Sequence, residues 1–211
     1  MERVSFGILR DRAVEALKQG KAAVVFVRTN DWFDFAARAV QIKGYFCHVE
    51  WLDYIDEQSG EIRTINANGK KVVWDSFERY KGACLSGKKE MTLGIVNCSH
   101  EEKLQMSVEM RSQVGHDYDD GQNRFEAITE IMSWFGGMWK AASGHLDKIN
   151  PMGDPNKFNC SESCARGIRA PKDGSVSKYN VCKDFDVQAI TPTDLANDGI
   201  VKKDYQTIKT A

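Results

Sequence analysis

Short runs of apolar residues in the first half of the chain predict a series of strands. The runs are rich in Val, Ile and aromatic side chains, and turn-forming residues separate them. The pair Asn68-Gly69 between two of these runs is a strong signal for a hairpin. The pattern predicts strands at residues 22–27, 45–54, 62–67, 71–77 and 91–97.

Apolar positions at helical spacing predict the helices that accompany these strands. Ser99 is a suitable N-cap for one of them, and Thr191 followed by Pro192 predicts a one-turn helix later in the chain. The predicted helices cover residues 11–19, 32–42, 101–114 and 161–168, and a mostly apolar and aromatic segment lies at 125–138. One helix, a run of strands and then further helices is an element order that indicates an α+β fold.

Composition and charge narrow the class of protein. Of the 211 residues, 42% are apolar and 28% are charged, which suits one domain with a buried core. The net charge of -1 argues against a dedicated surface for nucleic acid or for an anionic membrane. We expect a domain at residues 22–200, with a helical extension at 1–21 and a polar tail at 201–211.

We expect a cytoplasmic protein whose cysteines are mostly reduced. The first 21 residues are charged and amphipathic, unlike the apolar core of a signal peptide. The chain has no stretch of about 20 uncharged apolar residues, so no segment is predicted to span a membrane. In that context the six cysteines indicate free thiols rather than a disulfide framework.

A cysteine stands where a short polar stretch meets the helix predicted at 161–168. Cys160 would lie on the unpaired N–H groups and the positive dipole end of that helix, and both favour a thiolate, which is the nucleophilic form of the side chain. The same N–H groups could hold an oxyanion. The alternative is a buried, inert cysteine that fills space as a small hydrophobic residue.

A cysteine nucleophile needs a base within hydrogen-bond reach, and the usual base is histidine. His48 lies in a predicted strand, His100 in a first helical turn, His116 in a polar loop and His145 in a long connection at 142–157. We select His48 because a strand holds a base more rigidly than a loop does. The alternative for His48 is a core histidine that is satisfied by backbone groups.

Five segments, taken in order along the chain, match the motifs of one family. They are an opening strand at 23–28, Cys47-His48-Val49 against Ser-His-Val, residues 115–119 against Gly-x-x-Tyr-Asp, Cys160-Ser161-Glu162 against Cys-Ser-Glu, and residues 191–195 against Thr-Pro-x-Asp-Leu. The chain thus resembles the permuted papain-like amidases of the YiiX/YaeF type, which are relatives of the NlpC-type cell-wall peptidases. The order of His before Cys is itself the permuted one.

The resemblance implies both a fold and an activity. The fold would be permuted papain-like, with an antiparallel sheet of about five strands packed with helices. The activity would be that of a cysteine hydrolase that cleaves an amide, ester or thioester bond, with Cys160 as nucleophile and His48 as general base. No metal or organic cofactor is expected, and the partner would be a peptide, a lipid or another acyl-containing substrate.

The third catalytic residue stays open between Asn66 and Glu50. The family usually has a polar residue, often an acid, on the strand after the His strand, and Asn66 corresponds to it here; its carbonyl can accept the imidazole N–H. Glu50 projects to the same face of its strand as His48. Tyr118 either offers a hydroxyl near the reacting carbonyl or anchors its loop. Cys47, where the family commonly has Ser, is assigned to packing on the opposite face.

Two other kinds of function stay open. The same Cys–His pair could serve an acyltransferase whose acceptor is a lipid or an amine. In a non-enzymatic alternative, Cys160 and Cys164 stand four residues apart on one helix face and would hold zinc together with His116 or Cys182, in a structural binding module.

Overall fold

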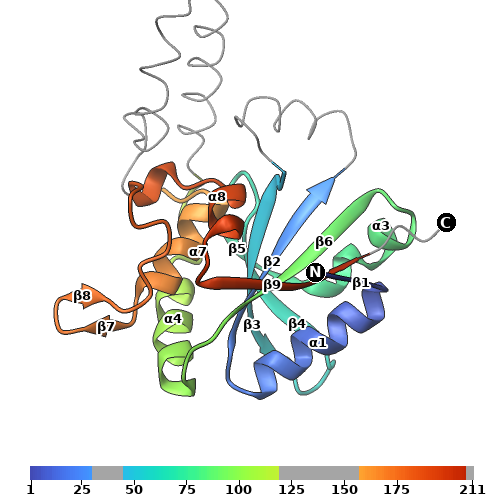
Figure 1. The fold of residues 1–211 in the computed structure, drawn as a ribbon. Coiled ribbons are helices and arrows are strands. Elements are labelled where there is room, and N and C mark those ends of the chain that lie inside the picture. The colour runs from blue at the N-terminus through green and yellow to red at the C-terminus, as the bar shows by residue number, and fades with distance from the viewer. Residues whose placement is uncertain (30–44, 119–156, 208–211) are drawn as a thin grey trace, which may run out of the picture.

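The structure is a computed structural model that describes residues 1–29, 45–118 and 157–207. A seven-stranded sheet runs through the molecule in the order β1-β9-β6-β2-β3-β4-β5, with helices on both faces (Figure 1). Neighbouring strands are antiparallel, except that β1 and β9 are parallel. The strands are β1 (Glu2–Val4), β2 (Ala22–Thr29), β3 (His48–Ile55), β4 (Ile62–Ala67), β5 (Val72–Ser76), β6 (Lys89–Val96) and β9 (Val201–Thr207).

Helices cover the two faces of this sheet in two groups (Figure 1). On one face lie α1 (Phe6–Lys18) and α3 (Lys81–Leu85), the latter preceded by a 3-10 turn, η1 (Phe77–Tyr80). The other face carries α4 (His100–Ser112), α7 (Cys160–Arg169) and α8 (Pro192–Asn197). The remaining described elements are the small hairpin of β7 (Lys172–Asp173) and β8 (Val176–Ser177), and the 3-10 turn η2 (Val187–Ala189).

Strand β2 explains why the molecule has two hydrophobic cores. Val24 and Phe26 point into the core beneath α4 and α7, whereas Val25 and Val27 point into the core beneath α1. Alternate side chains of a strand point to opposite faces, and a strand covered on both faces needs apolar residues at every position. The continuous apolar run at 22–27 is therefore the signature of a central strand.

The mixed α/β architecture is compatible with the α+β class, but the predicted sheet is too small. Seven strands are present instead of about five, and the parallel pair β1–β9 makes the sheet mixed instead of antiparallel. The strand predicted at 62–67 has those bounds, and those predicted at 22–27, 45–54, 71–77 and 91–97 differ by a few residues at their ends. The helix predicted at 32–42 and the segment at 125–138 lie outside the described residues.

The predicted N-terminal extension, residues 1–21, is instead part of the domain. Strand β1 pairs with β9, and α1 starts at Phe6, earlier than the predicted 11–19, because Ser5 caps it through the N–H of Ile8. Phe6, Leu9 and Ala13 recur at helical spacing and are buried against the sheet. The prediction missed these residues because it started the apolar face one turn too late.

The described part of the predicted polar tail, residues 201–207, is a strand instead. Residues Val201–Thr207 form β9, which lies between β1 and β6 and pairs with both. A strand with neighbours on both sides satisfies its backbone N–H and C=O groups whatever side chains it carries. The Lys and Asp residues of β9 break up any run of apolar residues, so the hydrophobic pattern did not predict a strand here.

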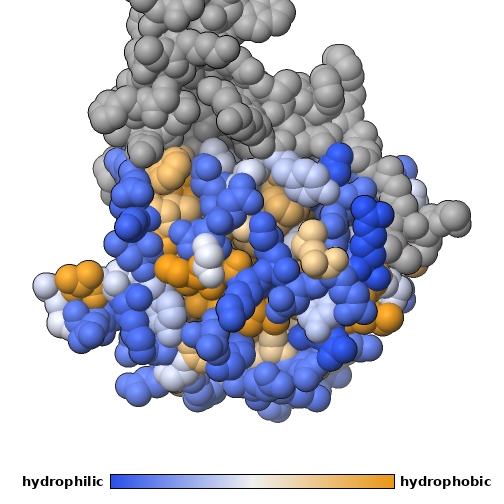
Figure 2. Space-filling model, in the orientation of Figure 1, coloured by the Kyte–Doolittle hydropathy of each residue, from blue (hydrophilic) through white to orange (hydrophobic). Residues whose placement is uncertain are grey.

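Most of the face seen in Figure 2 is hydrophilic, and hydrophobic residues show through it in patches. None of the helices in the described part of the chain combines the length and the apolar character that a membrane crossing requires.

Strands β3 and β4 separate at the end of the sheet that carries His48. Their pairing includes Trp51 with Ile65, yet β3 begins three residues before Trp51 and β4 continues to Ala67. At this end β3 stays paired with β2, and β4 stays paired with β5. The described strands thus leave a gap in the middle of the sheet, which the candidate site occupies.

Candidate active site

Cys160 is the first residue of α7, as predicted. Asn159 caps the helix: its side-chain oxygen accepts the N–H of Glu162 at 2.8 Å and the hydroxyl of Ser161 at 3.0 Å. The Ser161 hydroxyl also donates to the carbonyl of Ile190, just before α8. Cys160 is only 6% exposed, so the cap fixes a nearly buried thiol on the helix N-terminus.

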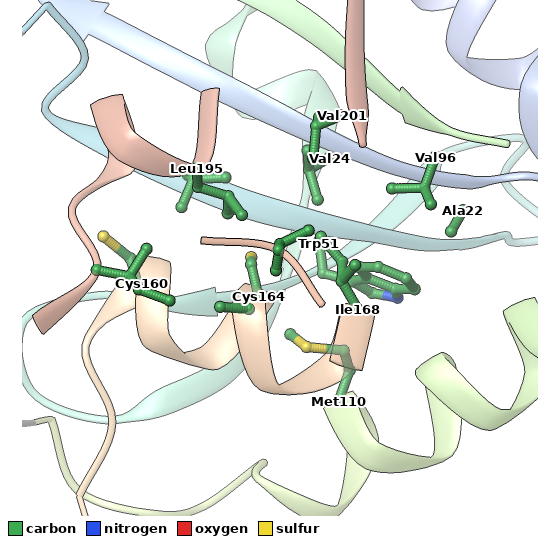
Figure 3. Packing of buried hydrophobic residues seen from close by; sticks show 14 of the residues in the cluster. Ala22, Val24, Trp51, Val96, Met110, Cys160, Cys164, Ile168, Leu195 and Val201 are labelled. Carbon is green, nitrogen blue, oxygen red and sulfur yellow. The ribbon is translucent and has the colours of Figure 1, made fainter. Parts of the chain in front are cut away.

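The packing of α7 aims this thiol at the sheet. Cys160, Cys164 and Ile168 lie on the helix face that meets the core, where Trp51 and Leu195 are among their neighbours (Figure 3). These helix positions recur at intervals of four residues, which places them on one face. The N-terminal end of α7 therefore meets the sheet where β3 and β4 part.

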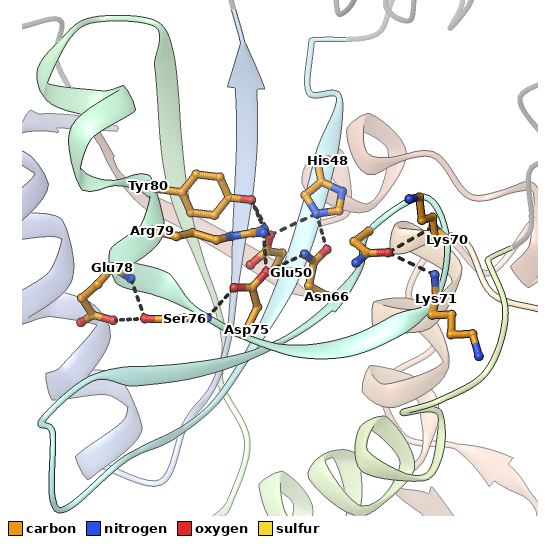
Figure 4. A network of polar contacts seen from close by, with 11 residues as sticks. His48, Glu50, Asn66, Lys70, Lys71, Asp75, Ser76, Glu78, Arg79 and Tyr80 are labelled. Carbon is orange, nitrogen blue, oxygen red and sulfur yellow. Dashed lines mark hydrogen bonds and ion pairs between the residues drawn. The ribbon is translucent and has the colours of Figure 1, made fainter.

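His48 lies on β3, at the end of the sheet where β3 and β4 separate. It is the first residue of β3, and its Nε2 lies 2.9 Å from Asn66 Oδ1 and 3.1 Å from Glu50 Oε1 (Figure 4). Asn66 belongs to β4, so the contact spans the gap. Both rival candidates for the third residue, Asn66 and Glu50, thus face the same ring nitrogen.

The contacts of Asn66 define which nitrogen of His48 carries the proton. The side-chain Nδ2 of Asn66 donates to Asp75 Oδ2 at 3.1 Å, which turns its Oδ1 toward His48. Nε2 then faces two acceptors and must be the protonated nitrogen. The side chains of His48 and Cys160 lie close enough to shift each other's pKa, and Nδ1 is the ring nitrogen left to face the thiol.

The charges of this pair favour a thiolate and an imidazolium. Burial alone would raise the pKa of Cys160, but the charge and hydrogen bond of His48, with the backbone N–H groups of Val49 and Ser161, leave that pKa below its usual value. Burial alone would lower the pKa of His48, but Cys160 and then Glu50 raise it well above the ordinary 6.5. Each partner stabilises the charged form of the other.

Glu50 is completely buried and still ionised. Burial alone would raise its pKa, but the hydrogen bond and charge of His48, the charge of Arg79 and the hydrogen bond of Tyr80 together lower it. The Arg79 guanidinium and the Tyr80 hydroxyl both donate to Glu50 Oε1 (Figure 4). Arg79 also donates to Asp75, the acceptor of the Asn66 amide, so one cation contacts both carboxylates of this network.

Sequence analysis missed Arg79, Tyr80 and Asp75. Asp75 lies one residue before the end of β5 and Arg79 lies in η1, four residues later, so the two form an i,i+4 ion pair. That spacing was the one signal available in the sequence. It could not identify Glu50 as the second partner, because Glu50 and Arg79 lie 29 residues apart along the chain.

Tyr118 lines a surface pocket together with His48 and Asn66. Its backbone N–H donates to the carbonyl of Lys70 at 2.9 Å, and it forms an isolated parallel bridge with Phe158, two residues before Cys160. The structure therefore brings Tyr118 to the site region, partly buried against the core. The role of its hydroxyl stays a prediction.

Cys47 also lines this pocket, which differs from its assigned place on the opposite face. It precedes the first residue of β3, so the alternation of the strand does not govern its side chain. Its Sγ lies 3.2 Å from the carbonyl of Val27.

The segment at 191–195 holds the strand of His48 in place. Thr191 and Asp194 form a capping box at the start of α8, with Pro192 at the first helical position, as the sequence indicates. Thr193 then accepts the backbone N–H groups of Tyr45 and Phe46 at 2.9 and 3.1 Å. The chain that enters β3 is therefore fastened to α8.

The residues named for a zinc site are dispersed. Among residues 1–29, 45–118 and 157–207, no three His, Cys, Asp or Glu side chains are grouped as a metal site requires. Burial raises the pKa of Cys164 well above its usual value, and it raises that of Cys182 to about 12. His116 packs edge-on against Phe158, His100 is exposed at the start of α4, and His145 lies outside the described residues.

No model of a known protein family matches this chain, and no curated protein matches it in sequence.

Proposed function

We propose that the protein is a cysteine hydrolase with a permuted papain-like fold, and that it cleaves an amide, ester or thioester bond. The observation that carries the proposal is the buried pair of Cys160 and His48, with the other ring nitrogen of His48 held by Asn66 and Glu50. A perturbed nucleophile, a base and an orienting group, arranged in this order, are what acyl transfer to a thiol requires.

The order of the elements supports the fold. His48 lies on a strand that precedes the nucleophile helix α7 in the chain, and α7 packs on the same strand in space. This is the permuted order, since papain-like enzymes of the ordinary kind place the cysteine helix first. The residues that resemble the family's fifth, C-terminal segment fasten the His strand through Thr193.

In the proposed reaction the Cys160 thiolate attacks the carbonyl carbon of the substrate. The His48 imidazolium gives its Nδ1 proton to the departing amine, alcohol or thiol, and a thioester between Cys160 and the acyl group remains. His48 then takes a proton from a water molecule, whose oxygen attacks the thioester. Release of the acid restores the thiolate and the imidazolium, and no other group is consumed.

The oxyanion formed in each step would lie at the N-terminus of α7. The first N–H groups of a helix have no acceptors within it, and one of them belongs to Cys160 itself. In other enzymes one such donor lowers the barrier by about 2.7–4 kcal/mol. Tyr118 is our candidate for a second donor, because it lines the pocket beside His48.

Alkylation with iodoacetamide at a series of pH values, mapped by mass spectrometry, tests the nucleophile. We expect Cys160 to react selectively at pH values below those at which an ordinary thiol reacts, because its pKa is lowered. Four other thiols serve as internal controls: burial raises the pKa of Cys84 to about 11 and of Cys182 to about 12, and it also raises those of Cys98 and Cys164.

The variant His48→Ala should lose the reactivity of Cys160 at low pH. If the native Cys160 reacts no faster than an ordinary thiol, or only after unfolding, the catalytic proposal is wrong. If Cys160 is selective, hydrolysis of amide, ester and thioester panels follows, with Cys160→Ala as the inactive control.

A further inference from the structure

The described lining of the pocket beside His48 carries basic side chains. This lining includes Arg79, Lys89 and His48, and it contains no Asp or Glu. Within this set Arg79 is already committed, because it donates to Glu50, Asp75 and the Tyr80 hydroxyl. Among the described lining residues, Lys89 is therefore the side-chain cation available to a ligand.

Lys89 has no carboxylate partner among the described residues. It is the first residue of β6, and its ammonium lies 5.1 Å from the centre of the Tyr80 ring. A lysine over an aromatic face is held in one place while its N–H donors stay available to other groups. Its exposed neighbour Lys88 does not line the pocket, which provides a matched control.

The partner of Lys89 in the sheet is a buried threonine whose side-chain hydroxyl has no hydrogen bond within the described part of the chain. Thr29 pairs with Lys89 across β2 and β6, and directly paired residues project to the same face of a sheet. Thr29 is only 4% exposed and lines the pocket, and its Oγ1 has no hydrogen-bond partner among the residues that the structure describes. A buried hydroxyl without a partner costs free energy that a ligand could recover.

We propose that Lys89 and Thr29 form a subsite that binds a carboxylate of the substrate. The inference rests on the proposed function, since it assigns a substrate class to the same pocket. The ammonium and the hydroxyl offer one donor to each of two carboxylate oxygens, with Val27 and Ala83 as the adjoining apolar lining. A phosphate dianion would call for more donors than these two, because Arg79 is occupied.

The subsite lies within reach of a peptide or acyl chain attacked by Cys160. His48 on β3 pairs with Val27 on β2. Lys89 on β6 pairs with Thr29, which lies two residues after Val27 on the same strand β2. Strand spacing alone puts the Cα atoms of His48 and Lys89 about 12 Å apart. We therefore expect the carboxylate a few residues, or an equivalent length of chain, from the reacting carbonyl.

A pair of thiol-reactive probes tests this assignment without a known substrate. Bromoacetamidohexanoic acid carries a carboxylate at the end of a linker, and its primary amide is the neutral isostere. We expect the acid to alkylate Cys160 about tenfold faster than the amide at low salt, the ratio that one charge-assisted hydrogen bond corresponds to. High salt should reduce the ratio, since Lys89 is partly exposed.

Substitutions of Lys89 and Thr29 then test whether these two residues cause the faster reaction of the acid. In Lys89→Gln and in Thr29→Val the ratio of acid to amide should fall toward one, whereas Lys88→Gln should keep the native ratio. Thr29→Val should fold at least as stably as the native protein, because it removes a buried hydroxyl that lacks a partner. Loss of the ratio in this variant could then not be attributed to unfolding.

The outcomes separate this inference from the proposed function. If iodoacetamide labels Cys160 selectively but the two probes react equally, the subsite is refuted and the hydrolase proposal stands. A phosphonate analogue that outpaces the carboxylate would also refute the assignment, in favour of a phosphate ligand. If Cys160 does not react selectively with iodoacetamide, both proposals fail together.

Discussion

Glu50 is the residue on which the charge of the site depends. Its carboxylate has no contact with solvent, yet three donors hold it ionised: His48, Arg79 and Tyr80. A carboxylate buried without them would become neutral. Because its pKa is lowered, its ionisation stabilises the folded state above its ordinary pKa, and this contribution is lost as the pH falls through the lowered value.

The variant Glu50→Gln should raise the pH at which Cys160 becomes reactive. Without the carboxylate the imidazolium is less stable, the pKa of His48 falls, and the thiolate loses part of its counter-charge. The measurement is the pH midpoint of Cys160 alkylation, with the exposed Glu57→Gln as a control of equal charge change. An unchanged midpoint in Glu50→Gln would show that Asn66 alone positions the imidazole.

At the scale of elements, α8 connects the two halves of the site. Ile190, two residues before it, accepts the hydroxyl of Ser161 in the first turn of α7. Thr193 in its first turn accepts two backbone N–H groups just before His48. One short helix therefore holds both the element that carries the thiol and the segment that leads to the base.

The variant Thr193→Val should loosen the segment that precedes His48. It leaves the N–H groups of Tyr45 and Phe46 without their acceptor, which we expect to cost about 1–2 kcal/mol of folding free energy. Hydrogen exchange at these two amides should become faster, and Cys160 should react more slowly at low pH. Thr193→Ser keeps the hydroxyl and should restore both, and equal exchange in the Val variant would contradict this role.

At the scale of the whole molecule, the sheet depends on a close approach between β6 and β9. Gly94 lies in β6 at the irregularity in its pairing with β9. A Cβ atom there would lie 2.7 Å from Val201 Cγ1 and 2.8 Å from Phe26 Cε2. The absence of a side chain at this position leaves room for the side chains of Val201 in β9 and Phe26 in β2, the two strands that flank β6.

The variant Gly94→Ala should destabilise the protein by about 1–3 kcal/mol, since packed neighbours from two strands must move. Denaturant unfolding measures the change. Gly82→Ala is the control: Gly82 lies in α3, where an added Cβ meets no atom within 4 Å, and Ala favours the helix. Equal stability of the two variants would show that β9 can shift without cost.

The sequence predicted those features that depend on local pattern. Cys160 at a helix start and His48 with Glu50 on one strand face follow from spacing along a single element. Arg79 could not be assigned, because its partner Glu50 comes from a distant strand. Strand β9 was missed because backbone pairing with two neighbouring strands holds it in the sheet, while its own side chains form no hydrophobic pattern in the sequence.

The parallel pair of β1 and β9 has a consequence for how the protein folds. Glu2 lies beside Tyr205, a separation of 203 positions (205 minus 2), and among the described strands β1 pairs only with β9. Closing so long a loop is entropically costly, and chains rich in such distant contacts fold slowly. We therefore expect β1 to join the sheet in a late step, after the central hairpins have formed, so that its edge of the sheet is completed last.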